Sequence, residues 1–389
     1  MFTFPGDMAV RGSLVGATYG TMGIASLFMP TIMGILADRF INAEKLLGIC
    51  HLIGAGMLYY ASTITNVNDL FIVILINSLF FMPTIALNNT VSYIILEREG
   101  HEVQKVFPPI RVWGTVGFIA AMWIMDWMKW TKSPNQFLVA ASAALIMGIY
   151  AFTMPACKPA KVSRGSSFIE ALGLDAFVLF KKTRMAVFFF FAMCLGAALQ
   201  ITNAFGEAFL HDFDSKYPGT FAVEHPSLLI SLSQISETLF ILTIPFFLIR
   251  FGIKRVMVMS MLAWFLRFGL FGIGNPGAGF PFLLLSMIVY GMAFDFFNIS
   301  GSMFVEKEAD IKMRASAQGL FMLMTNGLGA FLGGLLSGWV VDHYTIDGVK
   351  QWPSIWFVFA AYALVLAVAF QLIFKYKHDP AMIAEVKHV

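Results

Sequence analysis

Charged residues are scarce in this chain. Asp, Glu, Lys and Arg make up only 13% of its 389 residues, whereas hydrophobic residues make up 58% and aromatic residues 15%. The mean hydropathy is +0.76. An average soluble domain holds about 25% charged residues, so this composition excludes a soluble globular protein and indicates a polytopic membrane protein.

Cysteine is also scarce. Cys50, Cys157 and Cys194 lie far apart in the sequence. Their odd number and wide spacing match neither a disulfide framework nor a metal-binding motif. Histidines are scattered singly, so we expect no metal site and no cofactor. The N-terminus lacks the basic segment and apolar core of a signal peptide.

Motifs of known enzyme classes are missing as well. The sequence contains no P-loop, no HExxH and no GxSxG. It also contains no soluble domain that could bind ATP. We therefore expect neither an enzyme nor a primary pump, unless a partner supplies the motor.

Long apolar runs dominate the chain instead. A helix needs about 20 mostly apolar residues to cross a bilayer, and backbone groups in lipid must be paired within the segment. The short alternating segments of a barrel are absent, so an all-α membrane protein is predicted. The eleven predicted spans are residues 12–37, 44–64, 69–96, 107–129, 136–154, 185–210, 226–249, 255–274, 278–303, 315–341 and 353–374.

Lysines and arginines gather in alternate connections between these spans. Of the 26 basic residues, 19 lie on one side, five lie on the other, and Arg111 and Arg267 lie inside spans. Cytoplasmic connections are enriched in Lys and Arg, so the C-terminus is predicted to be cytoplasmic. With eleven spans, the N-terminus would then lie outside.

One long connection, residues 155–184, separates five spans from six. It begins with the loop-like PACKPAKVSRGSS and continues with the amphipathic FIEALGLDAFVLFKK, where Ser167 and Glu170 match a capping box. We expect this segment to lie on the inner membrane surface. The predicted domains are an N-terminal bundle at 1–154, this linker with an amphipathic helix at 155–184, and a C-terminal bundle with its tail at 185–389.

Polar side chains inside the apolar runs are the candidate functional residues. An ionisable group at bilayer depth costs about 2.5–3.5 kcal/mol on insertion scales, so it usually faces a cavity or a partner. Residues three or four apart share a helix face. The candidate sets are Gln200 with Asn203, Gln234 with Glu237, Arg111 with Thr115 and Phe118, and Tyr290 with Phe294 and the adjacent Asp295.

Each set also has a purely structural interpretation. Amides inside spans often hydrogen-bond neighbouring helices, and Arg111 can extend its side chain to the membrane surface. Glu237 and Asp295 can pair with Arg111 or Arg267 as a structural lock. Together, however, the sets offer donors, acceptors, carboxylates and aromatic faces, which a polar, partly aromatic solute needs in exchange for water. A carboxyl group withdrawn from water also holds a proton more readily, which suits a proton-coupled cycle.

Several strings resemble one family of transporters. GILADR at 34–39 is similar to a loop motif of the major facilitator superfamily, although Ile41-Asn42-Ala43-Glu44 replace its usual glycine and basic residues. The chain resembles the bacterial nucleoside:proton symporters more specifically, and this resemblance runs from about residue 2 to residue 378. The strings that carry this resemblance are FPPIRVWGTVGFI (107–119), LGLDAFVLFK (172–181), LQITNAFG (199–206), SLSQISETLFILTIPFFL (231–248), VYGMAFDFFNISGSMFVEKE (289–308) and RASAQGLFMLMTNGLG (314–329).

The resemblance implies twelve helices in two bundles, with a central nucleoside site that opens alternately to each side. The amides and Glu237 would hydrogen-bond ribose hydroxyls and base edges, and the aromatic residues would stack on the base. The implied substrate-binding residues are Arg111, Thr115, Phe118, Gln200, Asn203, Gln234, Glu237, Tyr290 and Phe294, and the implied carriers of the coupling proton are Asp295 and Glu237. The expected partners are a nucleoside, a proton and the lipid bilayer, without nucleic acid, for a monomer in the inner (cytoplasmic) membrane.

One departure from the family lies at the N-terminus. Members of the family begin with one more helix, and Met1-Phe2 of this chain match only the end of that helix. The chain as printed therefore holds eleven of the twelve spans. Either the true start lies upstream or the chain is a truncated, transport-inactive product. We expect poor transport from the chain as printed and normal transport once it is extended.

Two other functions stay open at this point. The same fold could carry another polar solute such as a sugar, because carboxylates and arginine suit sugars equally well. A non-transporting receptor or scaffold would bind nucleosides without accumulating them. Competition for uridine uptake by sugars and by nucleosides distinguishes the two transport functions.

Overall fold

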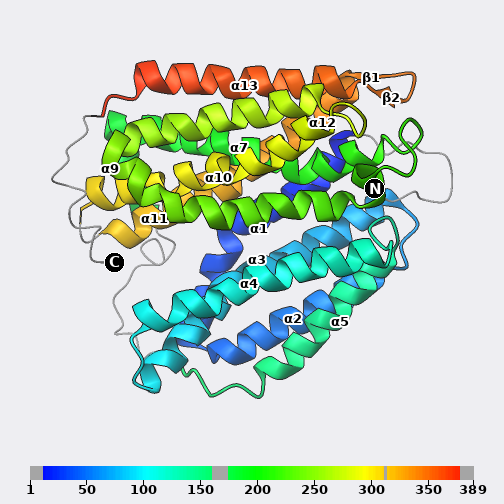
Figure 1. The fold of residues 1–389 in the computed structure, drawn as a ribbon. Coiled ribbons are helices and arrows are strands. Elements are labelled where there is room, and N and C mark those ends of the chain that lie inside the picture. Colours follow the sequence, from blue (N-terminus) through cyan, green and yellow to red (C-terminus); the bar gives the residue numbers. More distant parts are fainter. Residues whose placement is uncertain (1–11, 160–173, 311–312, 377–389) are drawn as a thin grey trace. The chain divides into compact units, whose positions relative to one another are not determined.

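The computed structural model describes residues 12–159, 174–310 and 313–376. These residues are almost entirely helical (Figure 1). The elements are α1 (Gly12–Arg39), α2 (Ala43–Ala61), α3 (Val67–Arg98), α4 (Val103–Trp127), α5 (Asn135–Ala151), the 3₁₀ helix η1 (Leu174–Lys181), α7 (Thr183–His211), α8 (Phe221–Glu224), α9 (Pro226–Ile273), α10 (Phe280–Glu308), α11 (Arg314–Met322), the π-helix η3 (Leu323–Gly329), α12 (Ala330–His343), β1 (Thr345–Ile346), β2 (Val349–Lys350) and α13 (Trp352–Ile373).

The contacts between helices divide the chain into two compact units. The N-terminal unit contains α2 to α5 and α1 from Ala17 onward, and the C-terminal unit contains residues 12–16 and everything from Asp175 onward. The division falls inside the predicted linker 155–184. The domain boundaries at 154 and 185 stay predictions.

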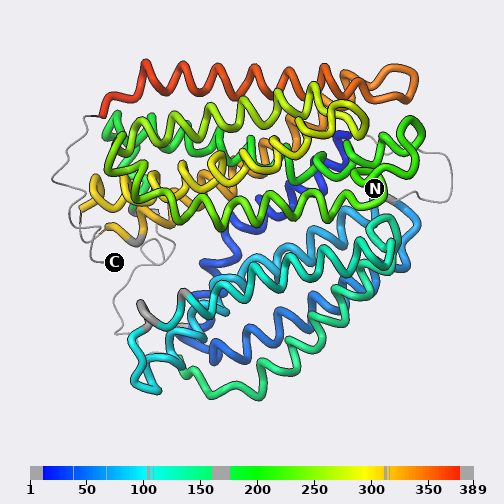
Figure 2. Tube along the Cα trace, in the orientation of Figure 1, coloured from blue at the N-terminus to red at the C-terminus, as the bar shows by residue number. Residues whose placement is uncertain are grey.

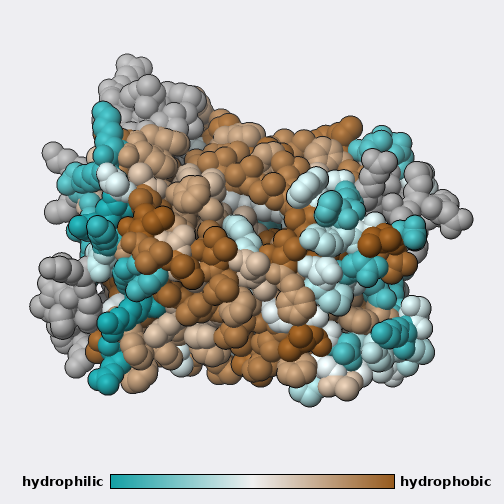
Figure 3. Space-filling model, turned by 90° about the horizontal axis from the view of Figure 1, so that it is seen from above, coloured by the Kyte–Doolittle hydropathy of each residue, from teal (hydrophilic) through white to brown (hydrophobic). Residues whose placement is uncertain are grey.

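Seven helices among the described residues are long and apolar enough to cross a membrane. These candidate spans are Gly12–Ala37, Asn68–Arg98, Thr183–His211, Pro226–Ile273, Phe280–Glu308, Ser316–His343 and Trp352–Ile373, and Asn135–Ala151 is a shorter apolar helix. On the face shown in Figure 3, apolar side chains cover the middle of the helices and hydrophilic ones gather toward their two ends. Helical segments occupy most of each predicted span, but the total of eleven spans stays a prediction.

Helix α9 contains a reversal of the chain. Gly252 has φ 77° and ψ 164°, a backbone region that is essentially reserved for glycine. The chain reverses there, so the segments on either side of Gly252 run in opposite directions (Figure 2). They correspond to the two predicted spans at 226–249 and 255–274.

The linker contains a helix in its second described part, and its amphipathic helix at the membrane surface stays a prediction. Residues 174–181 form a 3₁₀ helix, and Ser167 and Glu170 lie outside the described residues. Ala176 and Leu179 are both almost fully buried. They are three residues apart, so the three-residue turn of a 3₁₀ helix puts both on the buried side.

The degenerate loop motif of the N-terminal unit has a structural role. Glu44 is only 2% exposed. One carboxylate oxygen accepts the Cys157 backbone N–H at 2.8 Å and the other accepts the Asn42 side-chain amide at 2.9 Å. The acidic residue that replaces the usual motif therefore fixes the segment after α5 to the start of α2.

Helix α1 begins against α12 within the C-terminal unit. The Asp342 carboxylate accepts the backbone N–H groups of Gly12 at 2.5 Å and Ser13 at 2.9 Å, which no intrahelical partner satisfies. A methyl group added at Gly338 would lie 2.5 Å from the Gly12 carbonyl oxygen, and one added at Gly16 would meet the Gly334 carbonyl oxygen. Glycines four apart on both helices thus allow close backbone contact.

Close backbone contact also joins α7 to η3 and α12. A methyl group added at Gly333 would lie 2.5 Å from the Cα of Ala197, and one added at Gly196 would meet the Thr325 carbonyl oxygen. In an apolar solvent, helix association depends on such packing rather than on a hydrophobic driving force. These glycines therefore determine how near α7 lies to the other two elements.

We predict that Gly333→Ala destabilises the protein. The added methyl group meets backbone atoms of α7, which cannot give way without moving the helix, and overpacking of this kind costs about 1–3 kcal/mol. The midpoint of thermal unfolding, measured on purified protein in detergent, should fall by several degrees. Gly269→Ala in α9 is the control, because nothing lies within 4 Å of its added methyl group. Equal stability of the two variants would contradict the packing described.

Candidate functional site

A close helix contact in the C-terminal unit brings two predicted sets together. A methyl group added at Gly291 on α10 would lie 2.5 Å from the Ser236 carbonyl oxygen on α9. The Ser236 hydroxyl also donates to the Ile288 carbonyl oxygen. This contact places Gln234 and Glu237 of α9 beside α10, where Tyr290, Phe294 and Asp295 are found.

Tyr290 lies at the centre of this cluster. Its ring is parallel to Phe294 at a centroid distance of 6.0 Å and meets Trp264 edge-on at 5.9 Å. The side chain of Gln234 makes a polar contact with Tyr290. Tyr290 is buried, whereas Gln234 and Phe294 are half-buried. The cluster therefore combines aromatic faces with polar groups that are not fully enclosed.

The two carboxyl groups of the cluster interact electrostatically with each other and with Tyr290. Asp295 is 5% exposed, and its Oδ2 atom has no hydrogen-bond partner among the described residues. Glu237 is half-buried. A buried carboxyl oxygen without a partner is costly, so it commonly marks a position that a ligand or a proton occupies.

Arg267 lies next to the cluster and is only 1% exposed. Its guanidinium group donates to the Ser286 carbonyl oxygen at 2.9 Å and the Ser233 hydroxyl at 3.3 Å. Its Cζ atom lies 4.5 Å from the centroid of the Tyr290 ring. Among the described residues, no carboxylate oxygen lies within 4.0 Å of it, so the structure holds no lock between Arg267 and Glu237 or Asp295.

The other predicted residues lie on two further helices. Gln200 on α7 is buried, and its Nε2 atom has no hydrogen-bond partner among the described residues, whereas Asn203 is exposed. In the N-terminal unit, α4 carries the set of Arg111, Thr115 and Phe118. Arg111 and Phe118 are exposed and Thr115 is half-buried.

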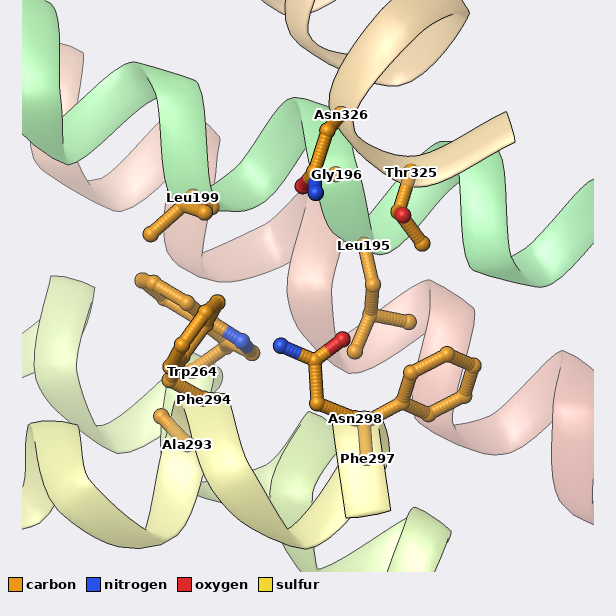
Figure 4. A pocket seen from close by; sticks show the side chains of 10 residues that line it. All are labelled: Leu195, Gly196, Leu199, Trp264, Ala293, Phe294, Phe297, Asn298, Thr325 and Asn326. Atoms are coloured by element: carbon orange, nitrogen blue, oxygen red, sulfur yellow. The ribbon is translucent and has the colours of Figure 1, made fainter. Parts of the chain in front are cut away.

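A pocket in the C-terminal unit contains residues that the sequence did not single out (Figure 4). It shares Phe294 with the cluster. Its other lining residues are Leu195, Gly196 and Leu199 of α7, Trp264 of α9, Ala293, Phe297 and Asn298 of α10, and Thr325 and Asn326 of η3. Asn298 follows Phe294 by four residues, and this spacing was the one available signal in the sequence.

Comparison with known proteins now decides the family. A family model described as "Nucleoside H+ symporter" matches residues 1–379. The chain belongs to this family. The resemblance seen in the sequence strings is thereby confirmed, and the family is one of transporters rather than enzymes.

Curated relatives and a solved structure agree with this assignment. Xanthosine permease of Escherichia coli (strain K12) is 56% identical over 97% of this chain and 90% of its own length. Nucleoside permease NupG of the same organism is 52% identical over 94% of this chain and 88% of its own. The crystal structure of nucleoside transporter NupG matches with a TM-score of 0.89, covering 94% of this chain and 91% of that one. The predicted all-α major facilitator fold is confirmed.

We predict that the fold tolerates Arg267→Met but not Arg267→Lys. Methionine removes a buried charge that has only neutral partners, and such replacements are often neutral or stabilising. Lysine keeps the charge but cannot reproduce the planar hydrogen-bonding geometry. The lysine variant should lose hydrogen bonds that contribute ~2 kcal/mol to the free energy of unfolding, and its unfolding midpoint should fall by about 5 °C. A methionine variant that unfolds far below the lysine variant would show that the charge itself stabilises the unit.

Proposed function

We propose that this chain takes up nucleosides together with protons by alternating access of one site to the two sides of the membrane. As a member of the nucleoside H+ symporter family with several apolar helices, it is a multi-pass inner-membrane protein. The observation that carries the proposal is the contact between α9 and α10. That contact joins a carboxyl pair, Glu237 and Asp295, to the parallel rings of Tyr290 and Phe294.

The cluster suits the two halves of a nucleoside. Ribose hydroxyls need acceptors and donors, which Glu237, Gln234 and the residues of α7 supply. A base needs a flat apolar face, and a stacked aromatic ring supplies one. Gln200 and Asn203 would add amides, and the set of Arg111, Thr115 and Phe118 in the N-terminal unit stays a prediction from the sequence. Family membership favours this substrate over a sugar.

Proton coupling is assigned to the carboxyl pair. Asp295 is the more buried of the two, has an oxygen atom without a partner, and interacts with Glu237. Loading the pair with a proton removes a buried negative charge, which lowers the cost of reorienting the nucleoside-loaded site, so that proton and nucleoside cross together. We assign the proton to Asp295 and the nucleoside contact to Glu237, with both groups changing charge as a pair.

The distribution of basic residues supports a cytoplasmic C-terminus. Major facilitator proteins carry their site inside one chain, so we also propose that the functional unit is a monomer.

We predict that Asp295→Asn separates coupling from binding. The variant should lose protonophore-sensitive accumulation of labelled uridine by at least tenfold, yet still exchange internal for external uridine. Glu237→Gln should lose both activities, because it removes a substrate contact. The measurement is uptake and exchange in cells without their own nucleoside carriers.

Glu99→Gln is the matched control for these variants. Glu99 is an exposed carboxylate that follows α3 and pairs with Arg98 at 3.4 Å on the surface. An exposed pair of this kind contributes little, so uptake should stay close to that of the unchanged chain. Full proton-driven accumulation by both Asp295→Asn and Glu237→Gln would overturn the assignment.

A further inference from the structure

The pocket beside the carboxyl cluster has a chemistry that the proposed roles do not use. Two primary amides, those of Asn298 and Asn326, extend into it from opposite walls (Figure 4). Asn298 is on α10 and Asn326 is on η3. The rings of Trp264 and Phe294 line the same space. Amides and rings together are what a flat heterocycle with polar edges requires.

The amide of Asn298 is available to a ligand. It is half-buried and makes no hydrogen bond with the described residues, whereas nearly all polar groups in such interiors have partners. The amide of Asn326 is exposed, and its one hydrogen bond with the described residues is a long one of 3.8 Å from Nδ2 to the Met322 sulfur. Both side chains therefore retain an unused carbonyl oxygen and unused N–H groups.

The backbone that carries Asn326 has an unusual helical geometry at the wall of the pocket. Residues 323–329 form a π-helix, and π-helical turns are rare and occur often at functional sites. The Thr325 hydroxyl donates to the Phe321 carbonyl oxygen at 2.9 Å, which helps to satisfy the altered backbone. Gly196 of α7 allows the Thr325 backbone to come into close contact. This combination holds Thr325 and Asn326 at the wall of the pocket.

The pocket has room for only an edge of a ligand. The space that a water-sized sphere can occupy inside it measures about 20 Å³. Sites for whole small molecules usually measure about 300–1,000 Å³. Its ring Phe294 is parallel to Tyr290, and its ring Trp264 meets Tyr290 edge-on, so the pocket and the carboxyl cluster share an aromatic wall.

We propose that Asn298 and Asn326 read the edge of the nucleobase, while Trp264 and Phe294 line its faces. A side-chain amide offers a donor and an acceptor side by side and pairs with base edges that offer the complement. One edge of the base then enters this pocket, and the ribose lies toward Gln234 and Glu237. This assignment rests on the proposed nucleoside function and adds two specificity-determining residues to it.

The test exploits two bases that differ at one edge. Both amides are proposed to donate to the exocyclic group at this edge, which is a carbonyl acceptor in uridine and an amino donor in cytidine. Asn298→Asp and Asn326→Asp keep the side-chain shape but replace the N–H donor with an acceptor. Binding of labelled uridine and cytidine to the purified protein should therefore shift toward cytidine at least fivefold in each variant.

Control variants show whether a changed base preference comes only from a change in the structure. Asn66→Asp is the control, because Asn66 caps α3 by accepting the Asn68 N–H at 3.0 Å, and aspartate caps equally well. Its ratio of cytidine to uridine affinity should not change. If an aspartate variant does not purify as a folded protein, Asn298→Ser and Asn326→Ser replace it. They should weaken both nucleosides about tenfold while leaving inhibition by free ribose unchanged.

The outcomes separate the two proposals. A shifted base ratio in the aspartate variants, with the control unchanged, supports the assignment. Nucleoside binding by the unchanged chain, with the same affinities and ratio in all asparagine variants, overturns the base-reading role and leaves the proposed function standing. Absence of nucleoside binding by the unchanged, folded protein overturns both.

Discussion

Close backbone contact at glycine is the constraint on which the rest of the C-terminal unit depends. Gly291 brings α10 against Ser236 of α9, and Gly196 brings α7 against Thr325. Without these contacts the helices would be separated by the width of a side chain, and polar groups on one helix would not reach those on the next. Helices in lipid cannot rely on water to drive them together, so small residues set the distances. The positions of the carboxyl cluster and of the amide pocket follow from them.

Polar groups inside such a bundle carry a cost that has to be offset locally. Arg267 shows one solution: a fully buried cation is held by a carbonyl oxygen, a hydroxyl and the face of Tyr290 rather than by a carboxylate. Asp295 shows the opposite case, because one of its oxygens has no partner among the described residues. We interpret the first as a fixed part of the unit and the second as a group whose charge changes during transport.

The sequence predicted the fold class and most of the candidate residues for a physical reason. Apolar runs of about 20 residues have few alternatives to a membrane helix, and a polar group inside such a run stands out. The spacing of Gln234 and Glu237, and of Tyr290 and Phe294, then identified shared faces. Both pairs lie on the two helices that Gly291 brings together.

What the sequence could not predict depends on contacts between distant segments and on local backbone geometry. The sequence spacing of Tyr290 and Phe294 already put their rings one helical turn apart. The edge-on contact between Trp264 and Tyr290, however, joins residues 26 positions apart. The π-helix at 323–329 has no simple sequence signal, so the placement of Asn326 beside Asn298 could not be foreseen. The 3₁₀ helix in the linker likewise reflects burial of Ala176 and Leu179. An amphipathic sequence pattern does not distinguish a 3₁₀ helix from an α-helix.

Transport in a defined membrane tests the central claim most directly. Purified protein is reconstituted into liposomes, and uptake of labelled uridine is followed with and without an imposed inward proton gradient, at zero membrane potential. The account predicts that the gradient alone drives uridine above its external concentration, and that collapsing the gradient releases it. Uridine that only equilibrates, at the same final level with and without the gradient, would contradict proton coupling.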